Sequence, residues 1–381
     1  MAKKLRVGIL FGGRSGEHEV SLLSAASILK AIDRTKFDVV PIGITKEGRW
    51  LASSDAHGLL EGDTSAAARR LRAGDPETTP GAKLLHEGIP TLLAPQPDQP
   101  ASTALDVVFP VLHGTFGEDG TIQGLFELAG IAYVGSGVLG SAAGMDKDVM
   151  KRLFAQARLP IVKHVTLLRA AWEKFPRKAI AQVEAALRYP VFVKPANLGS
   201  SVGISKAHNR KELGPALDLA AKYDRKLVVE QGVGGKGAKA RELEVAVLGN
   251  DTPQASVVGE IVPGKEFYDY EAKYLSEGSV PIIPAKLTRA ETKQIRAMAV
   301  AAFQACDLSG LARVDFLMEP AGKRRIFLNE VNTLPGFTQI SMYPKLWDAT
   351  GIPYRDLITR LIELALERHK DKTRTTYSRQ E

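Results

Sequence analysis

The sequence lacks the features that mark secreted, disulfide-bonded or membrane-spanning chains. It contains one cysteine, Cys306, so no disulfide can form within the chain, and a single thiol suits a reducing compartment. No segment approaches the roughly 18 apolar residues that a membrane-spanning helix needs. The apolar run after Lys4 has only about six residues, too few for the core of a signal peptide. We therefore expect a soluble, cytoplasmic protein with no membrane partner.

A continuous basic stripe is also missing. The chain carries 51 Lys and Arg residues against 43 Asp and Glu residues, a net charge of +8, but the two signs are mixed along the chain. The most basic stretch, 367–381, is expected to be a solvated tail. We therefore expect no nucleic-acid partner, and the basic balance equally suits a protein that handles polyanionic small molecules such as ATP.

The remaining composition is that of a globular protein large enough for two or three domains, with 44% hydrophobic and 25% charged residues among 381. Residues 5–45 alternate as strand, helix and strand, which predicts the opening of a parallel α/β sheet. Residues 105–135 repeat this order. Ligands bind at the carboxyl ends of parallel strands, where the loops 12–21 and 113–120 fall.

The second half of the chain changes character. The pattern predicts a helix from 146 to 157, a strand at 190–195, a helix at 210–222 and a strand at 226–231. From about 240, alternating strands indicate an antiparallel sheet, and residues 354–371 form a closing amphipathic helix. We expect three α/β units, of which the last is richest in antiparallel strands. Residues 52–104, with a hairpin-like segment at 83–94, read as a peripheral insertion without an assigned role.

The stretch 312–332 predicts a hairpin that carries a candidate metal site. If Ala321 and Gly322 form a tight turn, Arg313 lies opposite Glu330. Because side chains alternate along a strand, four polar residues then share one face: Arg313, Asp315, Glu330 and Asn332. Leu311 and Leu328 fall on the same face. Two acids and an amide are hard oxygen ligands that suit Mg²⁺ bridging phosphates. A hairpin with ordinary cross-strand ion pairs explains the same residues, and a register slip of one residue would separate them.

Residues 193–206, "VKPANLGSSVGISK", place Lys194 on an apolar strand before a loop of Gly and Ser. A Walker loop needs its lysine after the glycines, so this would be a different kind of phosphate site. Each candidate residue here also has a simpler interpretation. Lys147 and Lys194 could be solvated lysines, Glu17 an acid at a solvated helix start, and His113 a buried structural histidine.

Seven motifs taken together closely resemble the ATP-grasp superfamily and, within it, the D-alanine–D-alanine ligase family. They occur in the family's order between residue 5 and about residue 345: "GGRSGEHEVS", "HGTFGEDGTIQG", "GSGVLGSAAGMDK", "VKPANLGSSVGISK", "FYDYEAKY", "ARVDF" and "NEVNTLPGFTQISMYPK". The resemblance implies an ATP-grasp fold of three α/β domains with a Rossmann-like first domain. The implied bounds are 1–135, 136–232 and 233–381, with the ATP-grasp region at about 151–364.

The resemblance implies ATP-dependent joining of two D-alanine molecules through a D-alanyl phosphate, as a supply for peptidoglycan synthesis, cell wall biogenesis and cell shape. It further implies two Mg²⁺ ions, with Mn²⁺ as a substitute, and a homodimer. A D-alanine–D-lactate or D-alanine–D-serine ligase is the nearest alternative, although the loop 271–275 with Tyr274 resembles the dipeptide-forming type. A non-catalytic nucleotide-binding module on the same scaffold is the alternative from another class.

The site residues follow from the resemblance, motif by motif. The ATP contacts would be Lys147, Lys194, Ser200, Ser201, Glu230, Glu242 and Lys273. The metal ligands would be Asp315, Glu330 and Asn332. The catalytic group would be Glu17, Ser200, Arg313 and Gly336. The D-alanine contacts would be Glu17, His113, Tyr274, Ser341 and Met342. A glycine-rich insertion at 232–240 leaves open whether Glu242 or Glu244 contacts the ribose.

Overall fold

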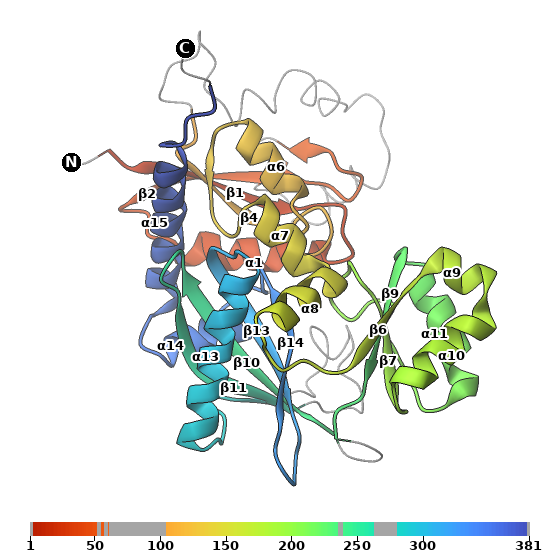
Figure 1. The fold of residues 1–381 in the computed structure, drawn as a ribbon. Coiled ribbons are helices and arrows are strands. Elements are labelled where there is room, and N and C mark those ends of the chain that lie inside the picture. The colour runs from red at the N-terminus through yellow and green to blue at the C-terminus, as the bar shows by residue number, and fades with distance from the viewer. Residues whose placement is uncertain are drawn as a thin grey trace.

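The computed structural model describes residues 3–51, 55–56, 60, 104–234, 239–262 and 280–378. These described residues form three sheets, and the central part of the chain stands to one side of the other two parts (Figure 1). The hairpin expected at 83–94 lies outside the described residues. The mixed α/β architecture expected from the sequence is confirmed.

The N-terminal sheet has five strands in the order β3-β2-β1-β4-β5. Its strands are β1 (Leu5–Gly12), β2 (Phe37–Ile44), β3 (Trp50–Leu51), β4 (Val107–Val111) and β5 (Ala132–Tyr133). All pairs are parallel except β2–β3, as expected for strands joined through helices. The helices with described bounds in this part include α1 (His18–Ala31) and α6 (Thr121–Leu128). The loops after β1 and β4 therefore leave the same edge of the sheet.

The central sheet is antiparallel, with the strand order β6-β9-β7-β8. Its strands are β6 (His164–Leu168), β7 (Val191–Pro195), β8 (Ser205–Ala207) and β9 (Lys226–Gln231). Three helices pack their apolar sides onto one face of it: α9 (Arg169–Lys174), α10 (Pro176–Ala186) and α11 (Arg210–Ala221). Val193 and Val229 enter this core. Because side chains alternate, Lys194 and Glu230 project from the opposite face.

The C-terminal sheet is also antiparallel, in the order β12-β11-β10-β13-β14. Its strands are β10 (Arg241–Gly249), β11 (Gln254–Val262), β12 (Val280–Ile282), β13 (Gly310–Met318) and β14 (Ile326–Asn332). Helix α13 (Arg289–Ala305) covers one face. Helices α14 (Met342–Asp348) and α15 (Tyr354–Lys372) pack on the other and join its core to that of the N-terminal sheet.

The hairpin β13–β14 differs in register from the tight turn expected at Ala321 and Gly322. Arg313 lies opposite Asn332 and Asp315 lies opposite Glu330, with a register shift between Asp315 and Phe316. Near the turn Phe316 faces Leu328, so Asn329 is the extra residue of a β-bulge. Arg313 is therefore not opposite Glu330, although the bulge restores the expected grouping of polar residues on one face.

The face on which Leu328 lies also differs from the expectation. The sequence pattern placed it with Leu311 on the polar face, but the bulge turns Leu328 to the other face, beside Phe316 and below α13. Leu311 instead belongs to the core beneath α14 and α15. One inserted residue thus exchanges the faces of a strand, because the side-chain period is two.

Two helices before the central sheet pack against the C-terminal sheet. They are α7 (Val138–Met145) and α8 (Lys147–Gln156), which contact β14. Met150 and Phe154 of α8 enter the core of the C-terminal sheet. Asp146 caps α8 by accepting hydrogen bonds from the N–H groups of Asp148 and Val149. This cap sets where the lysine-bearing helix begins.

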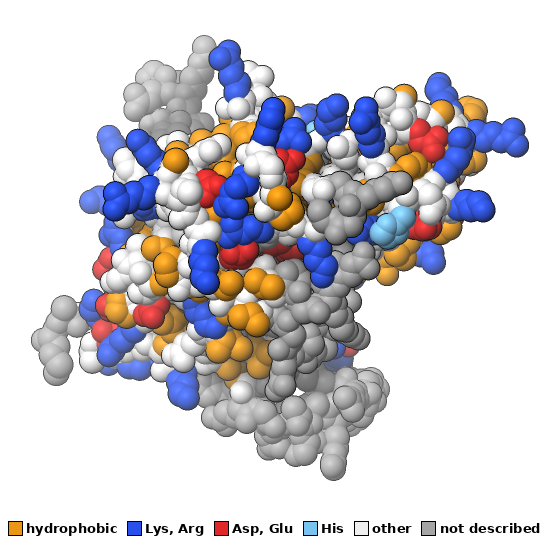
Figure 2. Space-filling model, turned by 90° about the horizontal axis from the view of Figure 1, so that it is seen from below, with side chains coloured by type: hydrophobic (Ala, Val, Ile, Leu, Met, Phe, Trp, Pro, Cys, Tyr) orange, Lys and Arg blue, Asp and Glu red, His pale blue; other side chains and the backbone are white. Residues whose placement is uncertain are grey.

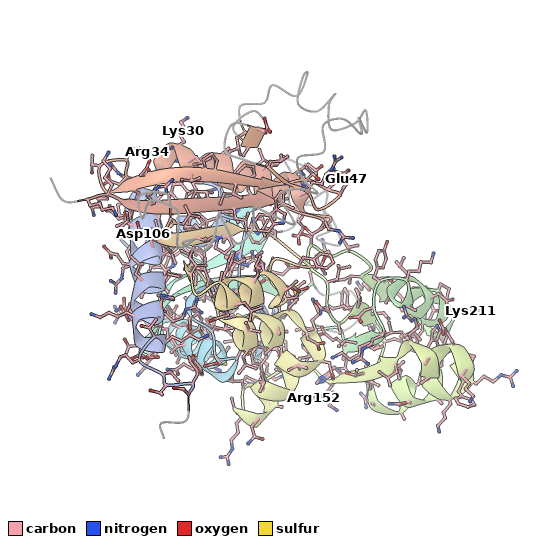
Figure 3. The ribbon with its side chains drawn as sticks, turned by 90° about the horizontal axis from the view of Figure 1, so that it is seen from above. Lys30, Arg34, Glu47, Asp106, Arg152 and Lys211 are labelled. Carbon is pink, nitrogen blue, oxygen red and sulfur yellow. The ribbon has the colours of Figure 1, made fainter. Side chains whose placement is uncertain are left out.

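Charged side chains lie around the outside of the molecule. Figure 2 shows Lys and Arg scattered among apolar and acidic groups on one face. The labelled residues Lys30, Arg34, Arg152 and Lys211 point away from the elements that carry them (Figure 3). Across the described ranges, no helix is both long enough and apolar enough to cross a membrane.

Candidate active site

Two adjoining cavities, of about 290 Å³ and about 210 Å³, lie where the three sheets meet. The first is lined by Glu17 of the N-terminal part and by the loop after β14, and the second by facing strands of the central and C-terminal sheets. The residues that line both are Lys147, Leu198, Gly199, Ser200, Glu244, Arg313 and Glu330. These shared residues form the boundary at which a group could pass from one ligand to the other.

The structure brings most of the expected site residues to these cavities. The first is lined by Glu17, Lys147, Ser200, Arg313, Glu330, Asn332, Gly336, Ser341 and Met342. The second is lined by Lys147, Lys194, Ser200, Ser201, Glu230, Glu242, Arg313, Asp315 and Glu330. His113 lines a different cavity, and Lys273 and Tyr274 lie outside the described residues.

Lys147 is not the exposed helix lysine that its position in the sequence could have meant. It is buried at the first turn of α8, where the helix dipole disfavours a positive charge. Its Nζ donates to the carbonyl of Leu198 at 2.8 Å and lies 3.9 Å from a carboxylate oxygen of Glu330. The ammonium group of Lys147 is thus held next to the Gly/Ser loop although the helix dipole disfavours a positive charge there.

The Gly/Ser loop lies at the boundary between the cavities, where Gly199 and Ser200 line both. Ser200 and Ser201 have φ values of 50° and 59°, in the left-handed region that side chains rarely adopt. Residues 200–203 form a turn, and successive backbone N–H groups in turns can form anion-binding concavities. Strain of this kind, of order 1–3 kcal/mol per residue, concentrates at functional sites. The loop therefore suits a phosphate group.

Glu230 stands between two lysines on the cavity-facing side of the central sheet. One carboxylate oxygen lies 2.8 Å from Nζ of Lys194, and the other lies 2.9 Å from Nζ of Lys151. Burial by itself would raise the pKa of Glu230, but the two ammonium groups outweigh burial and hold the pKa well below its usual range. For Lys194, burial is outweighed in the same way, by Glu230 and then Glu330, and its pKa is raised. Glu230 and Lys194 therefore stay ionised near neutral pH.

The C-terminal sheet contributes a row of charges on one face. Arg313 donates two hydrogen bonds to Asp315, at 2.7 Å and 2.6 Å. Its Nε also lies 3.4 Å from a carboxylate oxygen of Glu244, which pairs with Asp315 across the β10–β13 ladder. A guanidinium group is thus oriented toward the boundary between the cavities by two carboxylates.

The loop 12–21 places a carboxylate at the first cavity. Glu17 is buried, 8% exposed, rather than solvated at the start of α1. A Cβ at Gly199 would lie 2.9 Å from Oε2 of Glu17, so the Gly/Ser loop approaches this carboxylate closely. Ser200 donates its hydroxyl hydrogen to the same carboxylate. Residues 183 positions apart in the chain therefore form one wall of the cavity.

His113 occupies a buried position behind the site. Its Nδ1 lies 2.8 Å from the carbonyl of Leu334, and its Nε2 lies 3.1 Å from the hydroxyl of Ser24. Burial lowers the pKa of His113, although Glu17 opposes this effect. A neutral ring that donates to Leu334 and accepts from Ser24 satisfies both contacts. His113 therefore joins the end of β4 to the loop that carries Gly336.

Reasoning from the sequence missed two residues at or behind the site, Glu118 and Lys151, and assigned a third, Glu244, incompletely. Glu118 lines the first cavity, and its pKa is raised to about 8 by burial and by the charge of Glu17. Glu118 lies within the motif at 113–120, so the motif itself was a signal. Glu244 was considered only for the ribose. Lys151 follows Lys147 at a spacing of four, which places both lysines on one side of a helix.

The three proposed metal ligands offer two carboxylates and one amide oxygen. Asp315 and Glu330 are cross-strand neighbours on one face, with Asn332 two residues further along β14. In the described parts of the chain, no three His, Cys, Asp or Glu side chains cluster to hold an ion by themselves. Two carboxylates and an amide therefore fit a magnesium ion that takes its other ligands from phosphates and water.

A cavity between two antiparallel sheets, lined by a Gly/Ser loop and by acidic and lysine side chains, is the arrangement of an ATP-grasp ligase. Family models agree: "D-ala D-ala ligase N-terminus" matches residues 6–136, and "D-ala D-ala ligase C-terminus" matches residues 153–363. The chain belongs to the D-alanine–D-alanine ligase family. The resemblance seen in the seven motifs is thereby confirmed.

Relatives of known function are similar over nearly the full length. The D-alanine–D-alanine ligase of Heliobacterium modesticaldum is 52% identical, covering 99% of this chain and 98% of that protein. That of Bacillus cytotoxicus is 48% identical, covering 98% and 99%. Among solved structures, the D-alanine–D-alanine ligase from Coxiella burnetii has a TM-score of 0.77 at 34% identity, covering 98% and 97%. The VanG D-Ala:D-Ser ligase from Enterococcus faecalis has a TM-score of 0.76 at 35% identity, covering 95% and 100%.

Proposed function

We propose that this protein joins two D-alanine molecules in an ATP-dependent reaction that yields D-alanyl-D-alanine, ADP and phosphate. The observation that carries the proposal is the shared boundary of the two cavities, where Lys147, Arg313 and Glu330 line both. A nucleotide in one cavity and an amino acid in the other would meet at these charges. The relatives at about half identity are D-alanine–D-alanine ligases.

The reaction has to make a carboxylate reactive toward an amine. The carboxylate of the first D-alanine attacks the γ-phosphorus of ATP, ADP leaves, and a D-alanyl phosphate forms. The amine of the second D-alanine attacks the acyl carbon through a tetrahedral oxyanion, and phosphate leaves as the amide bond forms. The site must therefore neutralise phosphate, stabilise an oxyanion and exclude water.

The second cavity is the nucleotide site. Lys147 and Lys194 neutralise the phosphates, and the backbone N–H groups of Ser200 and Ser201 close over them. Glu230 accepts a hydrogen bond from the amino group of adenine. Glu242 contacts the ribose, because Glu244 is engaged at Arg313 nearer the other cavity. Lys273, outside the described residues, is assigned to the phosphates by resemblance alone.

Asp315, Glu330 and Asn332 would hold two Mg²⁺ ions, for which Mn²⁺ could substitute. Bound there, the ions would supply neutralisation of the charge that develops on the transferred phosphoryl group. The residues contribute the donor atoms and the rigid sheet that orients them. Helix α13 packs beneath β13 and β14 and keeps this face in place.

The first cavity is the amino-acid site. Glu17 holds the ammonium group of the first D-alanine, and Arg313 with the backbone N–H of Gly336 stabilises the tetrahedral oxyanion. Ser341 and the backbone of Met342 bind the carboxylate of the second D-alanine. His113 supports this cavity by holding the loop before Gly336. Tyr274, outside the described residues, is assigned to the covering loop.

The same proposal includes the setting of the reaction. The product would feed peptidoglycan synthesis in the cytoplasm and so cell wall biogenesis and cell shape, and the enzyme would be a homodimer. The domains would be 1–135, 136–232 and 233–381. Helix α8 belongs to the second range in sequence but packs on the C-terminal sheet, so it would tie the two halves of the nucleotide site together.

ADP release tests the function. Purified protein with ATP, Mg²⁺ and D-alanine should release ADP and phosphate and form the dipeptide. The same assay with D-lactate or D-serine added near neutral pH separates the related activities, and dominant incorporation of either would replace this proposal. Nucleotide binding without phosphate release would indicate a non-catalytic module.

A further inference from the structure

Lys151 is a charged residue whose burial the proposed chemistry leaves unexplained. Its side chain is fully buried on α8, and it lines neither of the two cavities. Its Nζ lies 2.9 Å from one carboxylate oxygen of Glu230 and donates to the carbonyl of Asn329 at 3.3 Å. Lys194 reaches the other oxygen of Glu230 and does line the nucleotide cavity. Glu230 therefore has one lysine on the cavity side and a second one behind it.

A purely structural role accounts poorly for this arrangement. Moving an ammonium group out of water costs several kcal/mol, and a buried ion pair seldom stabilises a fold more than apolar residues of similar size. Helix α8 already packs through Met150 and Phe154, so Lys151 is not needed to attach it to the C-terminal sheet. Two lysines for one carboxylate also exceed what is needed to balance Glu230. The second positive charge must serve Glu230 itself.

The two lysines differ in what they can do when a nucleotide binds. Lys194 lies at the cavity and would turn toward the phosphates, which weakens its hold on Glu230. Lys151 has no route to the ligand, and its partners are protein atoms. A buried carboxylate that lost its only counter-ion would take up a proton and lose its strength as an acceptor. Lys151 prevents this loss.

We propose that Lys151 is a positioning residue that keeps Glu230 ionised and oriented as the acceptor for the amino group of adenine, and so determines the choice of ATP over 6-oxo purine nucleotides. This inference rests on the proposed nucleotide site. The amino group of adenine donates a hydrogen bond, whereas the 6-oxo group of inosine or guanosine triphosphate accepts one and faces a carboxylate with no hydrogen to offer. Selectivity then depends on the charge of Glu230.

The contact with Asn329 extends the same role toward the metal site. Asn329 is the bulge residue directly before Glu330, and its carbonyl accepts a hydrogen bond from Lys151. By holding this carbonyl and Glu230 at once, Lys151 sets the spacing between the adenine end and the phosphate end of the cavity. We expect its loss to affect nucleotide binding more than the later chemical step.

The test measures binding of ATP and of inosine triphosphate to Lys151→Met and Lys151→Gln by calorimetry, with Mg²⁺ and without D-alanine. Met preserves the length of the side chain without its charge, and Gln keeps a hydrogen-bond donor without charge. Both should lower the ratio of ATP to inosine triphosphate affinity by roughly tenfold or more. Arg152→Met is the matched control, because Arg152 is the next residue of α8 and is 70% exposed. It should leave the ratio unchanged.

A double variant shows whether the effect runs through Glu230. In a Glu230→Gln background, Lys151→Met should lower the ratio little further, because the charge on which it acts is already gone. An unchanged ratio in folded Lys151→Met, or full additivity in the double variant, would overturn the inference. Equal binding of the two nucleotides by the unaltered protein would do the same. Because D-alanine is absent, these results are separate from those of the ligase assay.

Discussion

The hydroxyl of Ser200 donates a hydrogen bond to the carboxylate of Glu17. Ser200 belongs to the loop after β7 and Glu17 to the loop after β1, so the contact joins the Gly/Ser loop to the wall of the first cavity. Ser200 holds a left-handed conformation that costs free energy. The contact therefore couples closure of the loop over phosphate to the position of the acid that would bind D-alanine.

Removing this hydroxyl should weaken binding of the first D-alanine more than binding of ATP. We expect Ser200→Ala to lower kcat/KM for D-alanine by roughly tenfold, because the carboxylate of Glu17 loses a charged hydrogen bond. Steady-state kinetics with each substrate varied in turn measure the effect. Ser200→Gly should show the same loss while relieving the backbone. If the Gly variant matches the unaltered protein, the hydroxyl is not required for D-alanine binding and the inferred coupling is wrong.

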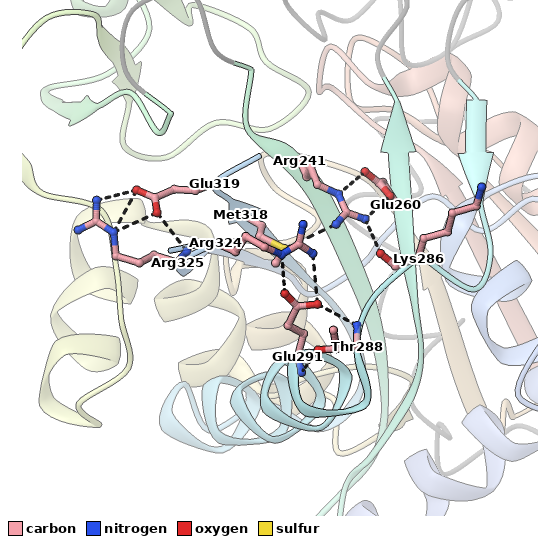
Figure 4. Close-up of polar contacts among 9 residues, drawn as sticks. All are labelled: Arg241, Glu260, Lys286, Thr288, Glu291, Met318, Glu319, Arg324 and Arg325. Atoms are coloured by element: carbon pink, nitrogen blue, oxygen red, sulfur yellow. Dashed lines mark hydrogen bonds and ion pairs between the residues drawn. The ribbon is translucent and has the colours of Figure 1, made fainter. Parts of the chain in front are cut away.

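Replacing Glu330 should nearly abolish turnover. Glu330→Gln keeps the shape of the side chain but removes the charge that would bind a metal ion, so a loss of more than about 10²-fold in kcat is expected. Electron paramagnetic resonance should show that Mn²⁺, titrated in the presence of ADP, binds more weakly to Glu330→Gln than to the unaltered protein. Glu319→Gln, on the same hairpin but at its outer end beside Arg325 (Figure 4), is the control. Near-normal turnover in Glu330→Gln would remove the metal assignment.

The buried Glu118 should make stability depend on pH. Burial and then the charge of Glu17 raise the pKa of Glu118 to about 8, above its ordinary value of 4.5. The folded protein thus holds this proton more tightly than the unfolded chain does. The corresponding stability is fully present below pH 4.5 and is lost as the pH rises through about 8, by up to about 1.4 kcal/mol per pH unit.

Thermal unfolding of Glu118→Gln between about pH 5 and pH 8 tests this linkage. The variant should lack the decline in stability with rising pH, because an amide does not titrate. Glu17→Gln should shrink the decline without removing it, since burial of Glu118 persists. The same slope in all three proteins would show that another group is responsible.

An ion-pair network at the outer end of the C-terminal sheet should affect stability without affecting activity. Glu291 caps α13 in a reciprocal pair with Thr288 and also accepts hydrogen bonds from Arg324 (Figure 4). Its pKa is lowered to about 2, first by the hydrogen bond from Arg324. Because the pair lies at the surface, with the Arg324 side chain 37% exposed and that of Glu291 15% exposed, the ion pair should contribute less than about 1 kcal/mol and the cap about 1 kcal/mol.

Glu291→Ala should therefore lower the free energy of unfolding by about 1–2 kcal/mol, and Glu291→Gln by less, because glutamine can still cap. The contribution of the ion pair is present above pH 4.5 and is lost as the pH falls toward 2. Chemical denaturation at neutral and acidic pH measures both. Unchanged ligase kinetics in each variant would confirm that the network lies outside the site.

Much of the site could be predicted from the sequence because its residues occur in short motifs on strands and loops. The alternation in 193–195 and in 227–230 places Lys194 and Glu230 on the face opposite the helices, as the structure shows. The grouping of Arg313, Asp315 and Glu330 was expected for the wrong register. A bulge at Asn329 restored it, and nothing in the pattern of the strand marked that bulge.

Other features depended on neighbours far along the chain. The role of Glu118 depends on burial and on Glu17, about a hundred residues away, and that of His113 on Leu334. The sequence could not show that Lys151 is buried, because lysine is rarely fully buried unless it is paired, and its partner Glu230 lies far along the chain.

The sequence by itself determined which segments become helices and strands, and which motif each site residue belongs to. These properties depend on side-chain periodicity and on nearby residues. Only the tertiary structure decided which charges share a buried environment: Ser200 with Glu17, and Glu230 between Lys151 and Lys194. Burial and the distance between charges control electrostatic energy, and both are set when the three sheets pack together.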